Sequence, residues 1–277
     1  MTPEISIITG TRNRPESLRR FLKSVHASAS IPTQLIIADA SDSLEELPSP
    51  LLPSEGSPHV IKTSYYCERP QLGTVKGYNA AFHRATGRYT CWFNDDCSLL
   101  PGWDKIAIDF MDAHREIGAG VIYFKDAGMS GYYVQEQPLA QHGNIVTANF
   151  AVIPTDLGNQ VGWFDEREVF IPELGRSEAL THYGCDNSVI LSILNAGFGV
   201  CQIPGCKVIH HRENDESRRE KMAEHMNCLP LPPGSKSGRI LWLLWNDPNR
   251  ADAEGYRRLK AEYEKHRRMI GPIHIGD

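Results

Sequence analysis

The spacing of hydrophobic positions switches between two periods over the first hundred residues. Short apolar runs rich in β-branched residues predict strands at residues 5–9, 35–38, 60–66 and 89–93. Between them, apolar residues three and four apart predict one helix after Pro15 and another over residues 74–85. Strands that alternate with helices pair in parallel through right-handed crossovers. The pattern therefore predicts an α/β fold with a Rossmann-like, mainly parallel twisted sheet flanked by helices.

The second half of the chain is less regular and reads as a mixed extension of the same sheet. The predicted elements are helices at residues 103–115 and 186–196 and strands at residues 120–124, 145–153, 198–203 and 207–210. Beyond residue 212 the chain is charged and contains prolines, with a helix expected around residues 253–268. We therefore expect a domain over residues 1–211, with halves 1–104 and 105–211, followed by an extension over residues 212–277.

Composition narrows the class of protein. A chain of 277 residues with 41% hydrophobic residues can bury a sizeable core, and its net charge of -5 disfavours nucleic acid as the main partner. The longest late apolar run, residues 240–245, is far below the roughly 20 residues of a membrane span, and no secretory signal is evident. Seven scattered cysteines indicate reduced thiols. We expect a cytoplasmic protein without a stable membrane span.

Polar clusters follow three of the predicted strands. They are Thr11-Arg12-Asn13, Asp39 and Asn94-Asp95-Asp96. In parallel sheets ligands bind beyond the carboxyl ends of the strands. Carboxylate and amide oxygens suit Mg²⁺ or Mn²⁺, which bind through one or two carboxylates and substrate phosphates. An aspartate-rich turn that caps the next helix is an equally good interpretation of the last cluster on its own.

The ordered series of motifs resembles the inverting family-2 glycosyltransferases of the GT-A fold. The resemblance is carried by residues 6–18, which match the opening strand and loop, by residues 35–39, and by residues 73–96, which lead into the position of the family's Asp-x-Asp motif. It covers residues 5–104 and 183–212. Two departures are Asn94 in place of the usual first aspartate and Tyr78 where an arginine is frequent.

The resemblance implies roles for several residues. Thr11, Arg12 and Asp39 would hold the nucleoside, with Asp39 reading the base. Asn79 would belong to the nucleotide-sugar site, Asp95 would lie near the ribose or sugar, and Asp96 would bind the metal, Mn²⁺ or Mg²⁺.

Two later positions complete the candidate site. Asp186 begins the helix at residues 186–196, where an aspartate is also a good cap, and the resemblance implies that it is the catalytic base. His210 or His211 would supply a metal ligand; adjacent strand residues face opposite sides, and we favour His210. Arg212, Arg218 and Arg219 either clamp a diphosphate or form a solvated loop.

The function implied is inverting transfer of a sugar from a nucleoside-diphosphate sugar, UDP by default, to an acceptor hydroxyl. The acceptor, which can be a glycan, a lipid-linked glycan, a protein or a modified nucleobase, would contact the loops at residues 125–141 and 164–181. Tyr132, Tyr133 and the adjacent Trp163 are available for stacking on a sugar ring. Two alternatives stay open: a catalytically silent sugar-nucleotide- or glycan-binding GT-A module, and a sugar-phosphate nucleotidyltransferase.

Overall fold

A computed structural model describes residues 1–42, 57–68, 72–134, 136–138, 144–146, 148–166, 168–171, 176–179 and 185–212 of the chain. The helix expected at residues 253–268, together with Arg218 and Arg219, lies outside these ranges. The division of the chain at residue 211 therefore stays a prediction.

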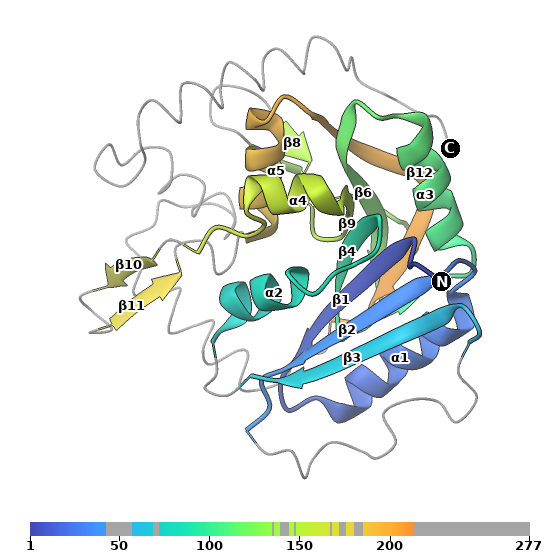
Figure 1. Ribbon diagram of the computed structural model, residues 1–277, viewed down its shortest axis with the longest axis horizontal. Helices are drawn as coiled ribbons and strands as arrows, with labels where there is room; N and C mark the ends of the chain where they lie inside the picture. Colours follow the sequence, from blue (N-terminus) through green and yellow to red (C-terminus); the bar gives the residue numbers. More distant parts are fainter. Residues whose placement is uncertain are drawn as a thin grey trace.

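A single eight-stranded sheet runs through the molecule in the order β3-β2-β1-β4-β9-β6-β12-β5 (Figure 1). Its strands are β1 (Ile5–Thr11), β2 (Thr33–Asp39), β3 (Val60–Cys67), β4 (Tyr89–Asn94), β5 (Cys97–Leu99), β6 (Ile117–Asp126), β9 (Ala151–Pro154) and β12 (Gly199–His210). Neighbouring strands are parallel except where β9 pairs with β4 and β6 and where β5 pairs with β12. The prediction of a mainly parallel sheet with a mixed second half is confirmed.

Helices cover both faces of this sheet. Side chains of α1 (Pro15–Ser28) and α3 (Trp103–Ala113) pack in the core on one face, and those of α2 (Thr74–Phe82), α4 (Thr155–Val161) and α5 (Cys185–Asn195) pack on the other. Two short ribbons pair β7 (Glu136–Pro138) with β8 (Asn144–Val146) and β10 (Glu168–Ile171) with β11 (Arg176–Ala179).

The central strands are apolar at successive positions because both of their faces are buried. In β2, Leu35 and Ile37 join the core on the α1 side, while Ile36 and Ala38 join the core on the α2 side. This explains why the runs in the sequence are continuous rather than alternating.

Two predicted boundaries were wrong. Residues 145–153, expected to form one strand, are divided between β8 and β9, because β9 is inserted antiparallel between β4 and β6 while β8 pairs with β7. Residues 198–203 and 207–210, expected as two strands, form the single strand β12. A register shift between Gln202 and Lys207 absorbs the Pro204-Gly205 step, with Gly205 at φ 74°.

Two elements of the main sheet region were missed. The seven-residue helix α4 is too short to show a clear periodicity, and the three residues of β5 carry no strand pattern of their own. β5 forms because the chain turns back after β4 and pairs with the end of β12. This turn brings the segment after β4 close to the last residues of β12.

Candidate active site

The carboxyl ends of five parallel strands meet at one edge of the sheet, and each carries a polar group. The terminal residues of β1, β2, β4, β6 and β12 are Thr11, Asp39, Asn94, Asp126 and His210. Asp95 and Asp96 follow β4 in the turn that leads into β5 and are 2% and 0% exposed. Charges held in such a place need partners.

Arg14 is the partner that the two aspartates share. It precedes α1 and makes no side-chain hydrogen bond to the helix backbone. Its Nη1 lies 2.6 Å from Asp95 Oδ1 and its Nη2 lies 3.1 Å from Asp96 Oδ2. Thr11 Oγ1 donates to the other oxygen of Asp95 at 2.7 Å. The planar guanidinium thus bridges two carboxylates, a geometry for which arginine is suited.

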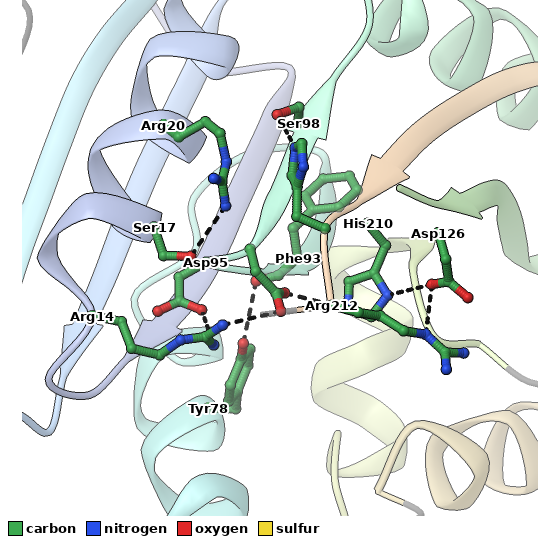
Figure 2. Close-up of polar contacts among 12 residues, drawn as sticks. Arg14, Ser17, Arg20, Tyr78, Phe93, Asp95, Ser98, Asp126, His210 and Arg212 are labelled. Carbon is green, nitrogen blue, oxygen red and sulfur yellow. Dashed lines mark hydrogen bonds and ion pairs between the residues drawn. The ribbon is translucent and has the colours of Figure 1, made fainter. Parts of the chain in front are cut away.

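His210 contacts Asp96 Oδ1, whereas Arg14 contacts Asp96 Oδ2. Figure 2 shows Arg14 and His210 together with Asp126 and Arg212. His210 Nε2 lies 3.3 Å from Asp96 Oδ1, and its Nδ1 lies 3.0 Å from Asp126 Oδ1. The neighbouring His211 instead bonds through Nε2 to Ser98 Oγ at 2.8 Å. Of the two histidines, His210 is therefore the one whose ring faces Asp96.

Asp126 and Arg212 extend the network away from Asp96. Asp126 accepts hydrogen bonds from Tyr133 OH at 2.7 Å and from His210 Nδ1, and Arg212 Nε lies 2.7 Å from its Oδ1. Carboxylates and nitrogen-bearing side chains thus alternate from Asp95 through Arg14, Asp96, His210 and Asp126 to Arg212. Neither Arg14 nor Asp126 was predicted from the sequence as a residue of the site.

The ionised form of both buried carboxyls is favoured by their partners. Burial alone would raise the pKa of Asp96, but its neighbours His210 and Arg14 outweigh this effect and hold that pKa below its usual range. Burial acts in the same sense on Asp126, and the donors Tyr133, His210 and Arg212 outweigh it, so its pKa is also lowered.

Asp96 and His210 are the described residues best placed to hold a divalent ion. No group of three His, Cys, Asp or Glu side chains with metal-binding geometry occurs in the described ranges. Among the described residues no hydrogen bond of good geometry satisfies His210 Nε2, which faces a carboxylate oxygen. One carboxylate and one imidazole fit an ion that takes its remaining ligands from water and phosphate.

The expected nucleoside side of the site lies at the ends of β1 and β2. Asp39 is fully buried; its Oδ1 accepts from the Ser41 backbone N–H at 2.7 Å and its Oδ2 accepts from Tyr65 OH. Arg12 lies in an exposed ion pair with Asp42, with Nη2 3.0 Å from Oδ1. Tyr65 and Asp42 are further residues that the sequence did not point to.

The remaining predicted residues lie at different places. The Asn79 amide donates to Phe164 O at 2.8 Å and to Glu166 Oε1 at 2.7 Å, and accepts from Phe164 N at 3.1 Å, so it fastens that segment to α2. Trp163, expected to stack on a sugar, is 1% exposed and stacks on Phe82 instead. That expectation was wrong, because the ring fills the core beneath α2.

Asp186 lies in the first turn of α5, after Cys185, and not ahead of the helix as a cap. The helix dipole favours a negative charge there. Its role as a base stays a prediction.

Comparison with known proteins decides the family. The glycosyl transferase family 2 profile matches residues 6–165, more than half of the chain. The chain belongs to glycosyl transferase family 2. It is accordingly a glycosyltransferase. A search of curated protein sequences returns no significant match.

Solved structures agree on the GT-A fold. Residues 1–349 of S. aureus TarS in complex with UDP-GlcNAc superpose with a TM-score of 0.59 at 14% identity, covering 98% of this chain and 74% of that one. The mannosyltransferase PcManGT from Pyrobaculum calidifontis in complex with GDP-Man and Mn²⁺ superposes with a TM-score of 0.56 at 13% identity, covering 99% and 77%. Within the described residues, no helix has the length and hydrophobicity to cross a bilayer.

Proposed function

We propose that this glycosyltransferase moves a sugar from a nucleoside-diphosphate sugar to an acceptor hydroxyl with inversion, assisted by a divalent metal ion and an aspartate base. The observation that carries the proposal is the facing pair of Asp96 Oδ1 and His210 Nε2, 3.3 Å apart at the carboxyl edge of the sheet. This is the edge at which ligands bind in parallel sheets.

The donor would occupy the ends of β1, β2 and β4. Thr11, Arg12 and Asp39 would hold the nucleoside, and Asp95 would lie near the ribose or sugar, with Asn79 supporting the sugar side. Nucleotide sugars in the two similar structures support the donor class. TarS carries a uracil nucleotide and PcManGT a guanine nucleotide. The base of the donor used by this chain is therefore to be measured, with UDP as the default.

Asp96 and His210 would hold the metal ion, Mn²⁺ or Mg²⁺. A divalent cation bound there would neutralise the negative charge that develops on the departing diphosphate. Arg14 would keep Asp96 ionised and turned so that Oδ1 remains directed at His210, since it holds Oδ2 at 3.1 Å. Mn²⁺ in one of the similar structures supports the choice of ion.

Asp186 would take the proton of the acceptor hydroxyl as the new bond forms. Its place in the first turn of α5 favours the carboxylate form that a base requires. A positioned base contributes roughly 10² to 10⁴-fold to the rate. In-line attack on the anomeric carbon, opposite the diphosphate, would invert its configuration.

The donor and metal are tested by thermal unfolding with UDP, GDP and dTDP, each with and without Mn²⁺, for wild type and Asp96→Ala. A ligand at about 100 times its Kd adds roughly 2.7 kcal/mol, a rise in Tm on the order of 5 to 10 °C at this chain length. We expect one nucleotide to raise Tm in a metal-dependent way in wild type only. An equal rise in Asp96→Ala would contradict the metal assignment.

The base is tested separately. We expect Asp186→Asn to lose about 10²-fold or more in sugar transfer or donor hydrolysis while its nucleotide-induced Tm rise persists. Loss of both would indicate a binding or folding defect. Nucleotide binding by wild type without any turnover would favour a catalytically silent module.

A further inference from the structure

We propose that Asp126 is a positioning residue for the metal site. It fixes the ring orientation and the tautomer of His210, so that the lone pair of Nε2 is directed toward Asp96. The inference rests on the proposed function, because it concerns the metal that Asp96 and His210 would share. It adds a residue that touches neither the metal nor the donor.

The sheet itself builds the contact between the two residues. β6 and β12 are parallel neighbours, and His210 is directly paired with Asp126 at the last register position. Paired residues on neighbouring strands project from the same face of a sheet, which accounts for the 3.0 Å between His210 Nδ1 and Asp126 Oδ1. Asp126 is mostly buried, and its position does not depend on a loop.

The tautomer follows from the chemistry of the partners. An ionised carboxylate only accepts hydrogen bonds, so the His210 Nδ1 that contacts Asp126 must carry the hydrogen. In a neutral imidazole Nε2 then bears the lone pair, and it faces Asp96 Oδ1 at 3.3 Å. Two electron-pair donors facing each other are stabilised by a cation between them. Histidines that ligate metals are oriented in this way by a carboxylate on the other ring nitrogen.

Asp126 is itself held on both oxygens, which makes it a rigid support. Tyr133 OH donates to Oδ2 at 2.7 Å, and Arg212 Nε lies 2.7 Å from Oδ1. The imidazole ring also packs against Phe124 and Phe150, with ring centroids 6.0 and 5.8 Å away. The Arg212 backbone has a φ of 49°, which is uncommon for a non-glycine residue, and the Arg212 side chain forms the ion pair with Asp126.

The test measures Mn²⁺ binding in the presence of saturating UDP, by the loss of the electron paramagnetic resonance signal of free Mn²⁺. We expect Asp126→Ala to bind Mn²⁺ about 10 to 100-fold more weakly than wild type. Asp126→Asn keeps an acceptor oxygen for Nδ1 and is expected to retain most of the affinity. The Kd of UDP without metal is expected to stay unchanged in both variants. Asp109→Ala, on the exposed face of α3, serves as the matched carboxylate control.

A double variant separates positioning from general destabilisation. If Asp126 acts through His210, Asp126→Ala should cause no further loss of Mn²⁺ affinity in a His210→Ala background. Wild-type Mn²⁺ affinity in Asp126→Ala would overturn the inference and leave the proposed function intact. No Mn²⁺ binding by wild type with UDP or GDP would overturn the metal step of the proposed function, and the role of Asp126 with it.

Discussion

Arg12 and Arg14 lie two positions apart in the chain but differ in how far their side chains are exposed to solvent. The Arg14 side chain is 16% exposed and contacts both Asp95 and Asp96, which are almost fully buried. The Arg12 side chain is 42% exposed and pairs with an exposed Asp42. Removing one partner of a buried ion pair leaves an uncompensated charge, whereas an exposed pair contributes little because solvent screens it.

We therefore expect Arg14→Ala to lower the free energy of unfolding by about 3 kcal/mol, because two buried carboxylates would lose their shared cation. Arg12→Ala, the matched control, is expected to cost less than about 1 kcal/mol. Urea unfolding at neutral pH measures both. Equal losses in the two variants would show that Arg14 does not compensate the aspartates in the folded protein.

The sequence indicated individual residues of the candidate site better than it indicated their partners. Asp96 and His210 were predicted, and the structure brings them within 3.3 Å of each other. Arg14 was missed because a residue just before Pro15 reads naturally as a helix cap. Asp126 was missed because the expected strand ended at residue 124, two residues before β6 ends. The available signal was a polar residue, Asp126, at the end of a strand, and it was overlooked because the strand was predicted to end too early.

At the scale of elements, one tyrosine spans β1 and β4 where these strands approach the site. Tyr78 on α2 accepts a hydrogen bond from the Gly10 backbone N–H at 3.1 Å and donates to Phe93 O at 3.2 Å. A Cβ at position 10 would lie 2.8 Å from the Tyr78 ring, so glycine is needed for this close approach. The tyrosine that departs from the family pattern thus connects two strand ends.

We expect Tyr78→Phe to lower the free energy of unfolding by about 1 to 3 kcal/mol, because it leaves buried backbone groups without a partner. Hydrogen exchange at the Gly10 amide is expected to become faster. Tyr66→Phe is a suitable comparison: the Tyr66 hydroxyl donates to Gly77 O within α2, and its loss is expected to cost less. Unchanged Gly10 protection in Tyr78→Phe would contradict the role assigned to the hydroxyl.

The elements themselves divide into those with a strong periodic signal and those that depend on distant pairing. β1, β2, β4, α1 and α2 were predicted because a strand buried on both faces or an amphipathic helix is visible in local sequence. β5 and β9 were not recognised correctly because each is short and exists by pairing with a strand far away in the chain. Local residue patterns contain little information on such pairing.

At the scale of the molecule, the candidate site lies at one edge of the sheet and a network of ion pairs lies at the opposite edge. The candidate site lies at the carboxyl ends of the parallel strands. Near their amino ends, Arg88 pairs with Glu4 ahead of β1 and with Asp112 on α3. Asp112 also contacts Arg115, with Nη2 2.7 Å from Oδ1, and Tyr89 OH, 2.8 Å away. This network joins α3 to the start of β4, and it shares no residue with the contacts of the site.

The separation of the two edges gives an expectation for Asp112→Asn. In the wild-type protein, the hydrogen bond between Arg88 and Asp112 is the main cause that lowers the pKa of Asp112 from 3.8 to about 2. A carboxyl whose pKa is lowered by folding stabilises the fold above the unfolded value and loses this contribution as pH falls through the folded value. Urea unfolding should therefore show that the variant is less stable than wild type by on the order of 1 kcal/mol at pH 6. The loss is small because the ion pairs are partly exposed to solvent. The difference should shrink below about pH 4 and vanish only below about pH 2, while nucleotide-induced shifts in Tm at pH 7 stay those of wild type. A difference independent of pH would mean that packing, and not the charge of Asp112, stabilises this edge.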